Sequence, residues 1–182
     1  MKTFTEPREL VEDPRYTQNR REALKVLDLG VIDPPIVKLI EGFSLLPQCF
    51  TLQSCYGHFL YAPGQDPHNL ERLPSIHEGP VTYRIAYIAL CLENSPRGGS
   101  LRESLEHIPA IDPGYVQFGS ARWFWARHRN TYALQVEPSR FMTEDEAIVE
   151  HAEALHIEQV RDIFFIKLGE LLERDLGELR RE

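Results

Sequence analysis

The sequence predicts a single mixed α/β domain, in which a small central sheet of about four strands is flanked by helices and followed by a long C-terminal helix. Its 182 residues suit one domain with a full core. Segments of helical periodicity alternate with short runs rich in strand-favouring residues. We find no internal repeat or linker, so the domain is expected to span residues 1–182.

The first elements are two helices and a strand. Apolar residues at helical spacing predict a helix over residues 15–29, and Gly30 follows as a C-terminal stop. Asp33 precedes two prolines and predicts the N-cap of a second helix that ends at about Leu46. Residues 49–55 are rich in β-formers and predict a strand that leads into a turn.

The middle of the chain combines a long loop with a core strand. Residues 61–80 are interrupted by proline and glycine, which predicts a loop long enough to cover a site. The apolar and aromatic run over residues 81–92 predicts a central strand. Ser100 predicts the cap of a short helix over residues 101–107, with Glu103 in the capping-box position.

The last third predicts a hairpin and then a helix. Residues 115–127 and 131–136 are aromatic and apolar, and the polar turn between them favours two paired strands. Thr143 and Glu146 form a capping box, after which one apolar face predicts a helix that runs to the end of the chain.

Composition limits the function classes. Hydrophobic residues make up 42% and charged residues 26%, which is typical of a globular protein. The formal net charge of -8 disfavours nucleic acid, tRNA included, unless a local basic patch exists. The cysteines, Cys49, Cys55 and Cys91, lack a disulfide-framework spacing, and neither a signal peptide nor a membrane span is indicated. We therefore expect a soluble cytoplasmic protein.

The turn Gln53-Ser54-Cys55-Tyr56-Gly57-His58 is the predicted site, with Cys55 and His58 as catalytic candidates. Three roles are open: a thiolate with an imidazole base, two ligands of a metal, or the polar walls of a ligand pocket. In the metal reading, His68, His77 or a carboxylate completes a zinc or iron site. The structural alternative makes Cys55 a small buried hydrophobe and His58 a surface residue.

A second candidate ligand surface is the aromatic and basic segment of residues 122–127. On a strand, Trp123 and Trp125 share one face and can stack on a ring, while Arg122 binds phosphate. Core packing explains the aromatics equally well. Glu137 closes the next strand as a general base or as an ion-pair partner of Arg122.

Two segments carry a family resemblance. Phe50-Thr51-Leu52-Gln53-Ser54-Cys55-Tyr56-Gly57-His58, preceded by two helices around Gly30-Val31-Ile32-Asp33, resembles the amino-terminal signature of the tRNA wybutosine-synthesis methyltransferase family. That family's comparable segment has the form Thr-x-Ser-Ser-Cys-Ser-Gly-Arg, so His58 stands at its arginine. A weaker likeness is Leu134-Gln135-Val136-Glu137-Pro138, which looks like the family's strand ending in Glu-Pro.

The resemblance implies a mixed α/β domain, S-adenosylmethionine as methyl donor and a modified guanosine of phenylalanine tRNA as substrate. It also implies that five residues border the site, namely Ser54, Cys55, Gly57, Glu137 and Pro138.

Three classes of function follow. The first is a protein that binds a small anionic or nucleotide-like ligand at residues 54–58, with the loop of residues 61–80 as a lid. As a methyltransferase it would also need a basic strip of Arg122, Arg127 and Arg129 to hold RNA. The second is a metal-binding protein or hydrolase that uses Cys55 and His58. The third is a noncatalytic interaction protein whose C-terminal helix pairs with a partner or with another copy of itself.

Overall fold

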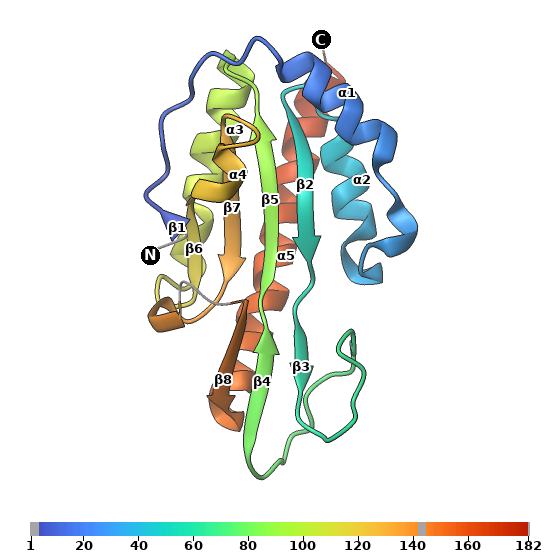
Figure 1. The fold of residues 1–182 in the computed structure, drawn as a ribbon, viewed down its shortest axis with the longest axis vertical. Helices are drawn as coiled ribbons and strands as arrows, with labels where there is room; N and C mark the ends of the chain where they lie inside the picture. The colour runs from blue at the N-terminus through green and yellow to red at the C-terminus, as the bar shows by residue number, and fades with distance from the viewer. Residues whose placement is uncertain (1–3, 142–144, 182) are drawn as a thin grey trace.

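The computed structural model describes residues 4–141 and 145–181, whose strands form two antiparallel sheets (Figure 1). The larger sheet has the order β1-β6-β7-β5-β2, with β1 (Phe4–Thr5), β6 (Val116–Ala121), β7 (Thr131–Val136), β5 (Ala86–Leu92) and β2 (Cys49–Cys55). The smaller sheet has the order β3-β4-β8, with β3 (His58–Leu60), β4 (Pro80–Arg84) and β8 (Glu146–Glu150). The mixed α/β class is confirmed, with a second sheet that was not expected.

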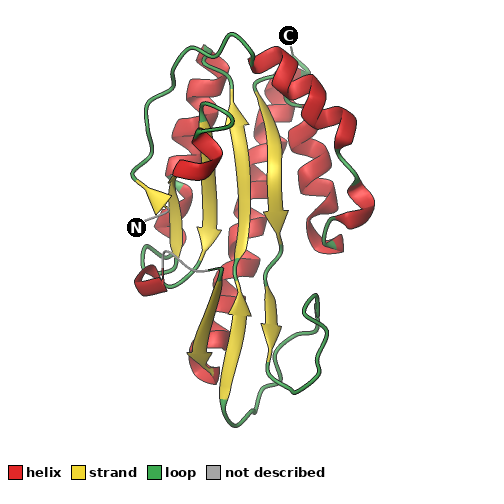
Figure 2. Ribbon diagram, in the orientation of Figure 1, coloured by secondary structure: helices red, strands yellow, loops and turns green. Residues whose placement is uncertain are grey.

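Helices cover both faces of the larger sheet. On one face α2 (Val37–Leu45), α3 (Pro96–Glu106) and α5 (His151–Leu179) enclose the main core. On the other face lie α1 (Tyr16–Val26) and the single turn α4 (Arg122–Trp125), which bury Tyr16 and Phe124. Figure 2 shows the long C-terminal helix α5 running behind both sheets. Short 3-10 helices cover Leu29–Val31, Pro34–Ile36, Ile108–Ile111 and Ser139–Phe141.

The two sheets meet at a seam where two long stretches of strand are interrupted together. In Figure 1, β2 continues in line into β3, and β4 continues into β5. The first stretch breaks at Tyr56 and Gly57, and the second breaks at Ile85. Gly57 has a φ of 88°, and a Cβ there would lie 2.9 Å from the Cβ of Ala86. The backbones therefore lie in close contact where the larger sheet ends.

A buried tyrosine fills this seam. The hydroxyl of Tyr83 accepts a hydrogen bond from the Ala86 N–H at 2.8 Å and donates one to the Val136 carbonyl at 2.9 Å. The hydroxyl therefore satisfies two buried backbone groups, the Ala86 N–H and the Val136 carbonyl, at the interruption of the strands. The expected core strand over residues 81–92 is present, but it is divided between the two sheets.

Several expected elements are confirmed: α1, α2, β2, the loop of residues 61–79 and β7 are present where the sequence predicts them. The helix α1 nevertheless ends at Val26, and Gly30 lies within a 3-10 turn instead of stopping the helix. The helix α3 begins earlier than expected, because Ser95 rather than Ser100 is its N-cap. The Ser95 side chain accepts a hydrogen bond from the Gly98 N–H at 3.2 Å, and Pro96 occupies the first turn.

Two expectations were wrong. Residues 122–125 are helical instead of continuing β6, and Phe124 is 6% exposed where it packs against Ala89 of β5. Residues 146–150 form the strand β8 instead of the start of the C-terminal helix. Its alternating pattern buries Ala147 and Val149 and leaves Glu146, Ile148 and Glu150 exposed, which is the strand period. Thr143, the expected cap, lies outside the described residues.

Within the described ranges, none of the helices is both long enough and apolar enough to cross a membrane.

Candidate functional site

Asp33, His58 and His68 come together at the seam between the two sheets. One possible ligand atom from each side chain lies within 4.8 Å of the other two. Asp33 precedes the 3-10 turn Pro34–Ile36, His58 is the first residue of β3, and His68 lies in the loop of residues 61–79. Three separate segments therefore meet at one point.

The imidazole of His58 is the buried centre of this group, with 1% of the residue exposed. Its Nδ1 lies 3.1 Å from the carbonyl oxygen of Asn69, which can only accept, so Nδ1 carries a proton. Its Nε2 faces the Asp33 Oδ2 at 3.4 Å. Hydrogen bonds to the side chains of Asp33 and Cys55 raise the pKa of His58 to about 10, although burial opposes this shift. The expectation of a surface histidine is wrong.

Asp33 was expected to cap the second helix, but its side chain makes no cap hydrogen bond. The two prolines that follow it have no N–H to donate, so the carboxylate turns away from the helix. Its Oδ2 instead accepts the Tyr56 N–H at 2.7 Å. Burial acts to raise the pKa of Asp33, but hydrogen bonds from His58 and Tyr56 outweigh it and lower that pKa.

Cys55 lies beside this group at the end of β2 and is half-buried. Its Sγ accepts the Gly57 N–H at 3.4 Å, and the thiol interacts with both His58 and Asp33. The structure thus brings together the predicted pair Cys55 and His58. It adds His68, which the metal interpretation named, and Asp33, which sequence reasoning used only as a cap.

The helix α5 holds the turn from behind. Arg161 is 5% exposed, donates to the Gly57 carbonyl at 3.2 Å and stacks over the Tyr56 ring at 4.2 Å. The Tyr56 hydroxyl donates to Asp162 at 3.0 Å. The helix α5 therefore contacts both residues of the turn, Tyr56 and Gly57.

The loop that carries His68 is fastened to the same helix. The Leu73 N–H donates to the buried Glu158 at 3.1 Å, and Arg72 pairs with Asp162 at 2.9 Å. Both contacts follow His68 closely in the chain. The side chain of His68 is exposed, so one side of the group formed by Asp33, His58 and His68 remains open to solvent.

The other predicted residues of the turn surround the site without joining the group. Gln53 is exposed and accepts a hydrogen bond from the Tyr87 hydroxyl at 3.4 Å, and Ser54 is half-buried on β2. His77 lies in the same loop as His68, but its ring packs edge-on against Tyr61 and His151. It is therefore not one of the three converging side chains.

The aromatic segment lies elsewhere. Trp125 packs edge-on against Tyr132, with Arg8 over its ring at 5.0 Å. The side chains of Arg122 and Trp123 lie outside the described ones, so the stacking hypothesis stays a prediction for them. Because residues 122–125 are helical, the strand geometry on which the expected shared face depended is absent.

Glu137 is fully buried near the other end of the seam. The Gln135 amide donates to its carboxylate at 2.8 Å, and the Gln117 amide donates to its carbonyl at 2.6 Å. The carboxylate is thus set in a buried amide network at the end of β7.

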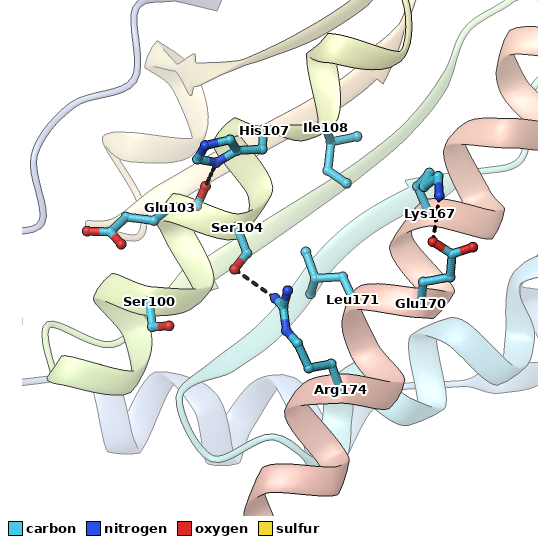
Figure 3. Close-up of a pocket in the computed structure, with 9 residues that line it drawn as sticks. All are labelled: Ser100, Glu103, Ser104, His107, Ile108, Lys167, Glu170, Leu171 and Arg174. Carbon is cyan, nitrogen blue, oxygen red and sulfur yellow. Dashed lines mark hydrogen bonds and ion pairs between the residues drawn. The ribbon is translucent and has the colours of Figure 1, made fainter.

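A separate pocket of about 450 Å³ lies between α3 and α5, and Figure 3 shows its side chains. Its polar groups bond to one another: Arg174 to Ser104 at 2.8 Å, and Lys167 to Glu170 at 2.7 Å. It shares no residue with the group at the seam, and its lining is Ser100, Glu103, Ser104, His107, Ile108, Lys167, Glu170, Leu171 and Arg174.

No protein-family model matches the chain, and no curated protein matches it. Among solved structures, it is similar to the PH1069 protein from Pyrococcus horikoshii, at 14% identity and a TM-score of 0.48 over 88% of this chain and 96% of that one. A second structure of PH1069, from strain OT3, has 13% identity and a TM-score of 0.48 over 92% and 96% of the two chains. A hypothetical protein from Aeropyrum pernix has 12% identity and a TM-score of 0.40 over 79% and 96%.

Proposed function

We propose that this protein binds a divalent transition metal, zinc or iron(II), through Asp33, His58 and His68. The observation that carries the proposal is the convergence of one carboxylate oxygen and two imidazole nitrogens within 4.8 Å of one another. Two imidazoles and a carboxylate are a donor set used by catalytic zinc sites and by non-haem iron(II) enzymes.

The surroundings of the donors support this function. The Nδ1 of His58 donates to the Asn69 carbonyl, which leaves the Nε2 lone pair directed toward Asp33 once the ring is neutral. Such a bond on the non-ligating nitrogen is the usual outer-shell support of a metal-binding histidine. The Tyr56 N–H orients the Asp33 carboxylate in the same way. Both ligands are therefore already aimed at a common point.

Three protein ligands leave a coordination position for water or substrate, which is typical of a catalytic rather than a structural metal. Cys55 lies against the group and places its sulfur at one side of it. A sulfur donor alongside two imidazoles favours zinc among the divalent metals. The chemistry supplied is that of a Lewis acid, which polarises a bound carbonyl or lowers the pKa of a bound water.

The test is metal binding by protein purified without a histidine tag, stripped with chelator and titrated with zinc or iron(II). His68→Ala is the informative variant because this side chain is exposed, and His77→Ala is the matched control from the same loop. We expect one metal per chain, and loss of one ligand lowers affinity by more than the roughly 10- to 100-fold typical of outer-shell changes. If wild type binds no metal, or His68→Ala binds as tightly as wild type, the proposal fails.

A second candidate is methyl transfer, which the resemblance to the tRNA wybutosine-synthesis methyltransferases implies. What supports it is that both resembling segments lie at the same end of the larger sheet. Cys55 pairs with Tyr87 of β5, and the neighbouring Ala86 pairs with Val136, next to Glu137. Calorimetric titration with S-adenosylmethionine, with and without chelator, tests this function. If neither S-adenosylmethionine binding nor salt-sensitive tRNA binding is detected, the methyltransferase proposal fails.

A further inference from the structure

An arginine lies beside the proposed metal centre. Arg84 of β4 is the direct cross-strand partner of His58, so both side chains stand on the same face of the smaller sheet. Its Nη1 donates to the carbonyl of Pro67 at 3.2 Å, the residue before His68. The guanidinium is thus next to both segments that supply the histidines, and 35% of its side chain is exposed.

A tyrosine of the larger sheet stands next to Cys55, and its hydroxyl donates an exposed hydrogen bond to Gln53 at 3.4 Å. Tyr87 of β5 is the direct cross-strand partner of Cys55, so these side chains also share a face. Burial raises the pKa of Tyr87 to about 12, with further increases from Cys55 and Asp145, while Arg84 lowers it. The phenol is therefore a neutral hydrogen-bond donor near physiological pH, and it lies within electrostatic reach of both the thiol and the guanidinium.

The local charge favours an anion despite the acidic chain. A divalent metal with one carboxylate and two neutral imidazoles carries a net charge of about +1, to which Arg84 adds another. The counter-charge is Glu146, whose Oε1 lies 3.3 Å from the Arg84 Nε. Because 55% of the Glu146 side chain is exposed, this is a surface pair of small net strength that a bound anion can displace.

We propose that the metal centre binds the oxyanion of its substrate, a carboxylate or a phosphate, with Arg84 and Tyr87 holding the oxygens that the metal does not. This inference rests on the proposed metal site and adds the substrate class to it. A planar guanidinium matches the two oxygens of a carboxylate or phosphate, and a phenol supplies one further donor. Neither residue belongs to the turn that the sequence marks as the site.

The experiment uses the full chain loaded with cobalt(II), whose visible absorption reports a new ligand on the metal. Inorganic phosphate and acetate are titrated separately, and the two arms show whether the site prefers phosphate or carboxylate. The variants are Arg84→Gln, Tyr87→Phe and Glu146→Gln, with Arg174→Gln in the distant α3–α5 pocket as the control. Metal affinity is measured first for every variant, so that failure of the metal site and failure of the anion site are told apart.

We expect at least one of the two anions to perturb the cobalt spectrum of wild type and of Arg174→Gln. Arg84→Gln should lower the affinity for the anion by about 10- to 100-fold, because a charge-assisted hydrogen bond is lost. Tyr87→Phe should lower it by about 3- to 10-fold, because a neutral hydrogen bond is lost. Glu146→Gln should strengthen it, since the competitor of Arg84 is removed. If metal binds but neither anion does, or if Arg84→Gln binds the anion as wild type does, the inference is overturned and the metal site stands. If Arg84→Gln also loses the metal, the other two variants decide the question. Weaker anion binding by Tyr87→Phe together with stronger anion binding by Glu146→Gln supports the inference. Any other result overturns it.

Discussion

Gly57→Ala tests whether the seam between the sheets depends on a residue without a side chain. Gly57 has a φ of 88°, in the left-handed region that L-residues avoid. An added Cβ would lie 2.9 Å from the Cβ of Ala86, and 3.1 and 3.2 Å from its N and Cα. Backbone atoms at this distance cannot rotate away, so either the two strands must separate or the turn must change its dihedral angles.

The expected cost has two parts. The left-handed backbone costs an alanine about 1–2 kcal/mol, and forcing a methyl group into packed core costs about 1–3 kcal/mol more. Gly64 isolates the first part, because it also has a positive φ, 72°, and a Cβ there would meet nothing within 4 Å. We therefore expect Gly57→Ala to lower the free energy of unfolding by about 2–5 kcal/mol and Gly64→Ala by about 1–2 kcal/mol.

The assay is urea denaturation of chelator-treated protein, followed by circular dichroism, with thermal melting as a check. For a chain of this size each kcal/mol shifts the Tm by about 2–4 °C, so the two variants should be clearly separated. Zinc affinity is measured on the same samples, and Gly57→Ala should weaken it because His58 follows the strained residue. Equal destabilisation by the two substitutions would refute the close-contact argument.

Three further predictions concern the residues around the seam. Tyr83→Phe should lower the free energy of unfolding by about 1–3 kcal/mol in urea titrations, because the buried Ala86 N–H loses its acceptor; an unchanged midpoint would contradict this. In metal-free protein, His58 has its pKa raised to about 10 from an unfolded value of about 6.5, so its contribution is complete below about pH 6.5 and is lost as the pH rises toward 10. Stability of wild type should therefore decline over that range in urea titrations at stepped pH, and His58→Gln should lack this decline. Arg161→Met should cost about 3 kcal/mol or more by the same measurement, because Glu158 is left buried without its cation, and adding Glu158→Gln should recover part of the loss.

Local pattern was enough for much of the fold. The strand over residues 49–55, the turn after it and the paired strand over residues 131–136 all follow from residue types a few positions apart. The local pattern fails where packing against a distant element determines the secondary structure. Phe124 turns residues 122–125 into a helix by burying its ring against β5, which no feature of the segment itself indicates. Cytoplasmic location and self-association through α5 stay predictions.

The candidate site was predicted in part for the same reason. Cys55 and His58 are close in sequence, so their spacing alone singled them out. Asp33 and His68 reach the site through long-range contacts, the first by accepting the Tyr56 N–H and the second through a loop that Glu158 fastens to α5. One local signal did exist for Asp33: two following prolines leave a capping carboxylate few N–H groups to bind.

The turn explains how a thiol and an imidazole three positions apart meet at all. On a regular strand, side chains an odd number of positions apart point to opposite faces, so Cys55 and His58 would lie on different sides of the sheet. The left-handed Gly57 breaks this alternation, and the Arg161 bond to its carbonyl holds the break in place. Tyr56 lies outside the ladder at this interruption, and Asp33 accepts its N–H. Strand pairing is therefore interrupted at the seam, and the donors of the proposed metal site converge at this interruption.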